Sequence, residues 1–226
     1  MNSDIQAIRA MKVDPEAEEF VRGEYARLYK DYNCAIREVR TKLEVLNEDF
    51  ELAHQHNPIH SMNARVKSVG SIIEKCYRMN YPLEDCKFTK YMMDIAGIRV
   101  ICHYIDDIYT VAELLGSQPD IEVVTIKDYI ENPKPNGYRS LHLVVKVPVY
   151  FVEGVKTLPV EVQIRTMAMD FWASLEHKLR YKSDGIIPAF VSRELKECAE
   201  AISSSDQQMQ KIHSFLDQLD QDLARM

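Results

Sequence analysis

The sequence lacks the features that mark several large classes of protein. Its apolar runs fall well short of the ~20 residues that a membrane-spanning helix needs, and its first residues include no apolar segment like that of a secretory signal. Its 5 cysteines form no C-x-x-C pair, which argues against a zinc site and for reduced thiols. The net charge of −7 argues against a chain that binds nucleic acid through overall basic charge. We therefore expect a cytoplasmic protein with no membrane partner, in which any polyanion site is a local cluster of Lys and Arg.

Both ends of the 226-residue chain have the apolar spacing of long amphipathic helices. In residues 15–57, apolar side chains recur every three or four positions, after Asp14 as a cap and Pro15 in the first turn. Residues 188–226 end with the same spacing from Ile212 to Leu223. Each helix can cover the core or pair with a second copy of the chain.

Between these ends, short β-branched or alternating runs predict strands at 98–102, 121–126, 141–149 and 160–166. Amphipathic stretches predict helices at 71–79, 106–115 and 167–182. Strands interleaved with helices indicate an α/β or α+β fold, with helices packed on a sheet.

A first basic cluster lies in residues 65–75 and contains Arg65, Lys67, Ser71 and Lys75. Ser68 and the Ser71-x-x-Glu74 pattern are rival caps for a helix that starts here, and Gly70 just before it would let a ligand approach the backbone. Free N–H groups at a helix start, with lysines beside them, suit a triphosphate. Lysines on a solvated helix start would have the same pattern.

A carboxylate and an arginine stand on either side of a strand start. Asp94 precedes an apolar run that Gly97 interrupts, and a carboxylate at a strand edge is a reasonable magnesium ligand. Arg99 lies inside the apolar run and is costly to bury without a partner. A structural Asp94–Arg99 ion pair is the alternative reading.

The loop at 131–139 contains two prolines and an Asn136-Gly137 turn. Around this turn stand four candidate side chains, Lys134, Tyr138, Arg139 and His142. Tyr138 can offer its ring to a purine while the cations hold phosphate, although a plain hairpin turn is the simpler interpretation.

Alternation in the strand at 160–166 places Glu161, Gln163 and Arg165 on one face. This is either a solvated face or an active-site face in which Glu161 serves as metal ligand or general base. Cation clusters, an aromatic loop and two carboxylates in one domain fit a magnesium-dependent transfer between two nucleotides.

The strings RVKSVGSIIEK, DIAGIRVIC, KPNGYRSLH and EVQIRTMAMDFWASLEHKLRYK occur in this order. Over about residues 60–185 they closely resemble the bacterial RelA/SpoT-type alarmone synthetases. In length the chain resembles the single-domain branch, the small alarmone synthetases, with residues 60–185 as catalytic core and 188–226 as an oligomerisation region. The resemblance implies a mixed β-sheet like that of nucleotidyltransferases. It also implies transfer of the β,γ-pyrophosphate of ATP to the ribose 3′-hydroxyl of GTP or GDP, giving (p)ppGpp and AMP in the stringent response, without hydrolase activity.

The resemblance implies a role for each candidate residue. Arg65 and Arg99 would sandwich the adenine of ATP. The ATP phosphates would be held by Lys67, Ser71 and Lys75, of which Lys75 also counts as catalytic. Asp94 and Glu161 would bind Mg²⁺, and Glu161 would activate the 3′-hydroxyl. The GTP or GDP site would comprise Lys134, Asn136, Tyr138, Arg139, His142 and Gln163.

The resemblance further implies a homotetramer, in which some relatives bind their product in a central cleft. The stretch Ser61, Met62, Asn63 and Ala64 has no aromatic side chain for such a cleft, and Asp170 would disfavour an anionic effector. We therefore expect weak or absent activation by pppGpp. Single-stranded RNA is a further candidate regulator, and a ribosome-binding domain is not expected.

Two other functions remain open from the sequence. A diverged toxic synthetase would use an adenosine nucleotide or tRNA as acceptor. A non-catalytic regulator would bind nucleotide or RNA on the same fold. The sequence does not decide between GTP and GDP or identify the physiological trigger.

Overall fold

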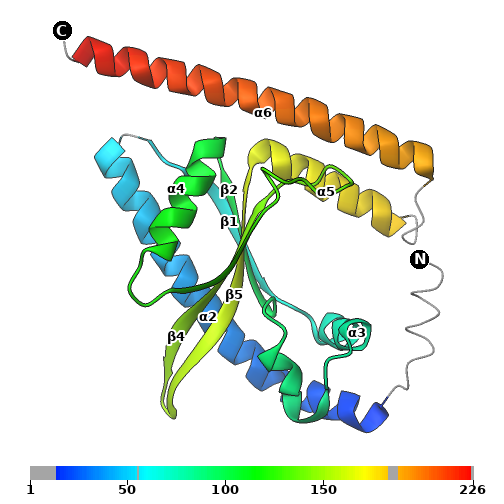
Figure 1. The fold of residues 1–226 in the computed structure, drawn as a ribbon. Helices are drawn as coiled ribbons and strands as arrows, with labels where there is room; N and C mark the ends of the chain where they lie inside the picture. The colour runs from blue at the N-terminus through cyan, green and yellow to red at the C-terminus, as the bar shows by residue number, and fades with distance from the viewer. Residues whose placement is uncertain (1–13, 55, 183–187, 225–226) are drawn as a thin grey trace.

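The computed structural model describes residues 14–54, 56–182 and 188–224, which form one mixed sheet with helices on both sides (Figure 1). The strands are β1 (Ile59–Val66), β2 (Ala96–Cys102), β3 (Glu122–Asp128), β4 (Leu141–Phe151) and β5 (Gly154–Thr166). Their order across the sheet is β1-β2-β5-β4-β3; β2 and β5 are parallel, and the other neighbours are antiparallel. The predicted fold class is therefore confirmed.

The helices are α2 (Pro15–His54), α3 (Val69–Met79), α4 (Ile105–Gly116), α5 (Met167–Lys182) and α6 (Ala189–Ala224), with a 3₁₀ segment η1 (Glu84–Lys90). Each predicted helix corresponds to one of these, and each predicted strand to β2, β3, β4 or β5. Residues 15–54 form one continuous helix, whose first turn is capped by Asp14 through Oδ1 accepting from the Ala17 N–H at 3.0 Å. The edge strand β1 was not predicted.

The core lies on one face of the sheet, beneath α2 and α4. Alternate residues of β4 and β5 are buried on this face: Leu141, Leu143, Val145, Val147, Val149, Val160, Val162 and Ile164. The apolar stripe of α2 meets them with Tyr32, Ala35, Val39 and Leu43, all buried. The N-terminal helix is thus a core helix, and the opposite face of the sheet is left for polar side chains.

The start of α3 decides between the two candidate caps and corrects one sequence prediction. Ser68, not Ser71, is the N-cap, and its hydroxyl accepts from the backbone N–H of Ser71 at 3.3 Å. Because the helix begins at Val69, Gly70 lies within its first turn and not before it. Gly70 is thus part of the helix.

The helix α6 crosses one end of the molecule over α5 and α4 (Figure 1). Its first half is tied down: the Trp172 indole N–H donates to the Leu195 carbonyl at 2.8 Å, and Thr166 Oγ1 donates to Asp206 at 2.6 Å. Its second half leaves Ile212, Leu216, Leu219 and Leu223 between 45% and 60% exposed. Within the described ranges, no helix is both long and apolar enough to cross a membrane.

Candidate functional site

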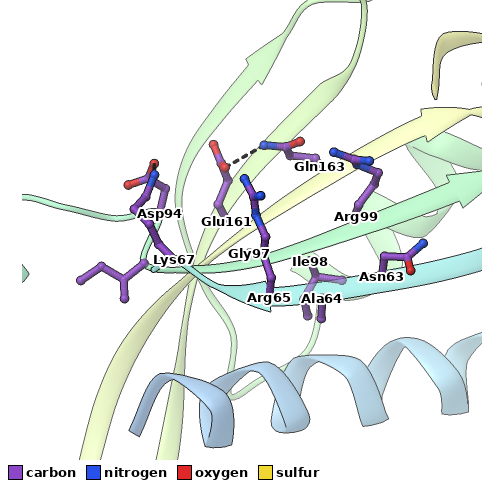
Figure 2. Close-up of a pocket in the computed structure, with 11 residues that line it drawn as sticks. Asn63, Ala64, Arg65, Lys67, Asp94, Gly97, Ile98, Arg99, Glu161 and Gln163 are labelled. Carbon is purple, nitrogen blue, oxygen red and sulfur yellow. Dashed lines mark hydrogen bonds and ion pairs between the residues drawn. The ribbon is translucent and has the colours of Figure 1, made fainter. Parts of the chain in front are cut away.

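A pocket of about 310 Å³ opens on the polar face of the sheet, above β1, β2 and β5. Strand register builds it, because Gly97 of β2 pairs with Arg65 on one side and with Glu161 on the other. Arg99, two residues along β2, pairs in the same way with Asn63 and Gln163. Gly97 has no side chain, so the floor between Arg65 and Glu161 stays open. Figure 2 shows Glu161, Gln163, Arg65 and Arg99 rising from the sheet on the side away from α2.

One end of the pocket concentrates charge around Asp94. The Lys67 ammonium lies 3.1 Å from one carboxylate oxygen of Asp94, and the Lys75 ammonium lies 2.7 Å from the other. The Lys67 backbone N–H donates to the Ile95 carbonyl at 2.8 Å, which joins the end of β1 to the start of β2. Burial alone would raise the pKa of Asp94, but the two ammonium groups outweigh it and hold that pKa below its usual range. Two lysines of the predicted basic cluster thus meet on Asp94, a contact that the sequence did not predict.

Glu161 stands in the centre of the pocket and receives a polar group on each oxygen. The Gln163 amide donates to Oε2 at 2.8 Å, and His142 Nδ1 lies 3.4 Å from Oε1. Burial raises the pKa of Glu161, but contacts with His142 and Gln163 more than offset it and leave that pKa lowered. The carboxylate is therefore held ionised, as a metal ligand or base must be.

Arg99 does not pair with Asp94, so the alternative of a structural Asp94–Arg99 ion pair is wrong. Its guanidinium lies 3.4 Å from Asp170 of α5. Burial lowers the pKa of Arg99, and the positive charge of Arg165 adds to this effect. Arg65 and Arg99 both line the pocket, as the predicted adenine sandwich requires.

The 131–139 loop forms the predicted turn beside this pocket. Gly137 has a φ of +92°, which only glycine adopts without strain, and its N–H donates to the Lys134 carbonyl at 2.8 Å. The Lys134 ammonium lies 4.6 Å from the ring centres of both Tyr129 and Tyr138. The Tyr138 hydroxyl lies 2.7 Å from His142 Nε2, which links the loop to Glu161.

Two predicted acceptor residues have other partners. The guanidinium of Arg139 donates to the carbonyls of Gly137 and Ala199, each at 3.3 Å, and so faces α6. The Asn136 amide donates to Glu176 of α5 at 3.1 Å. Both residues hold the loop against the C-terminal helices, and their contact with a nucleotide stays a prediction.

Arg165 is a residue to which the sequence assigned no role. It is 4% exposed and is hydrogen-bonded to Tyr138, Ser140, Gln163 and Asp170. Its place on the Glu161 face was the one available signal. An arginine on a polar strand face is typical of solvated surface, so the pattern alone gave no reason to select it.

The donor set fits a hard divalent cation. Asp94 and Glu161 both line the pocket, and Asp94 is near enough to affect the pKa of Glu161. Among the described residues no group of three or more His, Cys, Asp or Glu side chains could hold a metal ion. Two carboxylates suit Mg²⁺, which keeps several waters and shares its remaining positions with substrate phosphates.

Comparisons with known proteins find a matching family model and several similar proteins. Residues 64–186 match a family model described as a region found in RelA / SpoT proteins. The chain is 43% identical over 186 residues to GTP pyrophosphokinase YwaC of Bacillus subtilis, covering 82% of this chain and 89% of that protein. It is similar to the crystal structure of small alarmone synthetase 1 from Bacillus subtilis bound to its product pppGpp, with TM-score 0.78 and 41% identity over 84% of this chain and 97% of that one. The same enzyme bound to AMPCPP gives TM-score 0.74 and 38% identity, over 87% and 99% of the two chains.

Proposed function

This chain belongs to the RelA/SpoT family, with single-domain small alarmone synthetases among its relatives, and on that premise we propose that it is a GTP pyrophosphokinase. It transfers the β,γ-pyrophosphate of ATP to the 3′-hydroxyl of GTP or GDP and releases AMP. One observation carries this proposal: a single pocket places Lys67, Asp94 and Glu161 beside an aromatic loop. The names of the relatives favour this activity over a toxic acceptor or a non-catalytic regulator.

ATP takes the side of the pocket formed by β1 and β2, next to α3, whose Lys75 contacts Asp94. Arg65 and Arg99 stack on adenine, and the triphosphate meets the cations Lys67 and Lys75 with the hydroxyl of Ser71. The two ammonium groups leave Asp94 and contact the phosphate oxygens of ATP instead. There they neutralise the negative charge that the transfer spreads over these oxygens. The Asp94 carboxylate is then released for a metal ion.

The acceptor takes the space on the other side of Glu161, toward the 131–139 loop and β4, which His142 links to Glu161. Tyr138 stacks on guanine once Lys134 moves from its ring to a phosphate. Asn136, Arg139, His142 and Gln163 complete this side. Glu161 accepts the proton of the 3′-hydroxyl, because it is held ionised and lies on the boundary between the two sides.

Asp94 and Glu161 are the residues that would hold Mg²⁺, beside the ATP phosphates. When bound, the ion neutralises charge on the reacting phosphates. The protein residues bind and orient the two nucleotides, and Glu161 takes the proton of the acceptor 3′-hydroxyl. Two oxygen ligands and shared phosphates are the arrangement that Mg²⁺ prefers.

The protein assembles as a homotetramer through its C-terminal region, 188–226, around a catalytic core at 60–185. Exposed apolar side chains support this on both helices: Met167, Phe171 and Leu175 of α5, and Met209, Phe215 and Leu219 of α6. Between them lies an apolar groove lined by Met167, Ala168, Phe171, Ala201, Ile202 and Ser205. A second copy would cover a surface that is costly to leave in water.

Other roles stay predictions. We expect a cytoplasmic enzyme, weak activation by pppGpp, and single-stranded RNA as a candidate regulator. Asp170 carries the negative charge expected to weaken activation, although Arg99 and Arg165 already balance it.

An acceptor panel tests the proposal. The protein is incubated with Mg²⁺, labelled ATP and GTP, GDP or ATP, and the products are separated by anion exchange. A new guanosine species with equimolar AMP supports the proposal and ranks the acceptors. Transfer to an adenosine acceptor alone, or nucleotide binding without transfer, would overturn it.

A further inference from the structure

Arg165 is a buried cation for which the proposed roles give no function. A buried guanidinium is costly unless its N–H groups are satisfied and its charge is balanced. All three of its nitrogens have partners: Nε donates to Ser140 Oγ at 3.3 Å, and Nη1 to Asp170 at 3.2 Å. Nη2 donates both to the Tyr138 hydroxyl and to Gln163 Oε1.

The Nη2 group fixes the orientation of the Gln163 side chain. A guanidinium has no acceptor, so the atom of Gln163 that faces Arg165 at 3.0 Å is the carbonyl oxygen. The amide nitrogen then points the other way and donates to Glu161 Oε2 at 2.8 Å. With the Gln163 amide flipped, its N–H would face an N–H of Arg165 and its oxygen would face the Glu161 carboxylate. Both contacts are repulsive, so the flipped orientation is excluded.

The same group sets the direction of a second chain through Tyr138 and His142. The Tyr138 oxygen accepts from Arg165, so its proton is available to His142 Nε2 at 2.7 Å. A neutral imidazole that accepts at Nε2 carries its proton on Nδ1. His142 Nδ1 lies 3.4 Å from Glu161 Oε1, where that proton meets the carboxylate.

We infer that Arg165 is a positioning residue that sets the direction of two hydrogen-bond chains, which end on the two oxygens of Glu161. One chain runs through Gln163 to Oε2 and the other through Tyr138 and His142 to Oε1. Because each oxygen accepts one N–H, the carboxylate is fixed in rotation. Its remaining lone pairs are left to meet the acceptor hydroxyl. The inference rests on the proposed function, since it gives Glu161 the role of base.

The charge of Arg165 is permanent, which suits it to this position. Arginine stays protonated at any working pH and offers its donors in a fixed planar fork. Lysine would place one nitrogen where the fork has three, so it cannot reach Tyr138, Gln163 and Asp170 together. Asp170 balances the buried charge and also lies 3.4 Å from Arg99, on the ATP side.

The tautomer of His142 tests the inference without turnover. Protein with ¹⁵N-labelled histidine is examined by NMR at pH 8 without nucleotide, and the His142 signal is assigned from a His142→Gln variant. We expect the neutral Nδ1–H tautomer in the natural protein, and a smaller preference for it in Arg165→Met. An Nε2–H tautomer or an imidazolium in the natural protein would overturn the inference.

Kinetics test it independently. Arg165→Lys should lower kcat about 10–100-fold, as loss of a supporting hydrogen bond does, while the Kd of ATP changes less than about threefold. Tyr138→Phe should lower kcat in the natural protein but cause no further loss in the Arg165→Lys background, because that chain has already lost its direction. If the losses in kcat of the two single variants add in the double variant, Arg165 only supports the fold. The same follows if ATP affinity falls as much as kcat does.

A matched control and a folding check complete the design. Arg40→Lys replaces an exposed arginine paired with Glu44 and should leave kcat unchanged. If Arg165→Lys fails to fold, the His142 tautomer in the natural protein still decides the inference. A natural protein that transfers no pyrophosphate but shows the Nδ1–H tautomer would contradict the proposed function and leave the arrangement around Glu161 supported.

Discussion

Among single residues, Glu161 is the one whose substitution should affect turnover without affecting ATP affinity. It lies in the centre of the pocket, whereas the cations proposed for ATP lie at one end and on the β1 side. Glu161→Gln removes the base and keeps the shape, so turnover should be lost while ATP affinity stays within a few-fold. Isothermal titration with a non-hydrolysable ATP analogue, beside a turnover assay, checks both halves. Equal loss of binding and turnover would remove Glu161 from the role of base.

Tyr138 combines a ring and a hydroxyl with separate expected roles. Tyr138→Ala removes the ring and should raise the KM of the acceptor by the ~1–3 kcal/mol that one base–aromatic stack contributes. Tyr138→Phe keeps the ring, so its acceptor KM should stay within about twofold of the natural value. Initial rates over a range of GTP concentrations measure both. An unchanged KM in Tyr138→Ala would place the guanine elsewhere.

The sequence predicted individual side chains better than their connections. Asp94 could be selected because it precedes an apolar strand, Glu161 because it lies on the polar face of an alternating strand, and Tyr138 because it stands in a constrained turn. Arg165 could not be selected, because its role depends on hydrogen bonds to Tyr138 and Asp170, which lie in other segments of the chain. A contact across the fold leaves no local signal.

At the scale of elements, the open floor of the pocket depends on Gly97. A Cβ there would meet nothing nearer than backbone oxygens at 3.9 and 4.0 Å, so a larger residue is compatible with the strand. Gly97→Val should therefore fold, and its side chain should crowd ATP at a cost of about 1–3 kcal/mol, which raises the Kd of ATP roughly 5- to 150-fold.

Titration with an ATP analogue and thermal unfolding measure these two effects. Gly23→Ala, at an open position inside α2, is the control: it should leave the Kd of ATP unchanged and slightly raise the unfolding temperature, because alanine is the better helix former. Natural ATP affinity in a folded Gly97→Val variant would show that adenine and phosphates do not lie over β2.

The contact between α6 and the end of β5 gives a pH-dependent prediction. Burial raises the pKa of Asp206, which accepts from Thr166 Oγ1 at 2.6 Å. A raised pKa means that ionisation destabilises the folded state, so stability is lost as pH rises through the folded pKa. Asp206→Asn keeps an acceptor without the charge and should have a higher free energy of unfolding than the natural protein at pH 8.

This difference should shrink on acidification and vanish below the ordinary carboxylate pKa of 3.8, where both folded and unfolded states are protonated. Urea unfolding at several pH values measures it. A difference that grows toward low pH would contradict a folded-state pKa of Asp206 that burial raises.

Elements with strong periodicity were predictable, whereas β1 was not. Its residues Ile59–Val66 are mostly polar or exposed, and they pair with β2 alone at the sheet edge. The pairing with β2 thus defines this strand, more than its own residues do. It nevertheless carries Arg65 and Asn63 of the pocket.

At the scale of the whole molecule, the two terminal helices differ in a way that spacing alone could not show. The stripe of α2 is buried under the sheet, while the stripe near the end of α6 stays exposed in the chain described. Leu216→Glu should therefore leave the fold intact and reduce the mass of the particle measured by light scattering. Gln207→Glu, on another side of the same helix, should leave the mass unchanged. An unchanged mass in both variants would move the interface away from this stripe.

The proposed reaction moves a pyrophosphoryl group, and not a single phosphoryl group, to guanosine. The most direct test uses two ATP samples, one labelled at the α-phosphorus and one at the γ-phosphorus, with GDP as acceptor. We expect the γ label in the guanosine product and the α label in an equal amount of AMP. Recovery of the α label as ADP would mean that the γ-phosphoryl group alone is transferred, and the protein would not be a pyrophosphokinase.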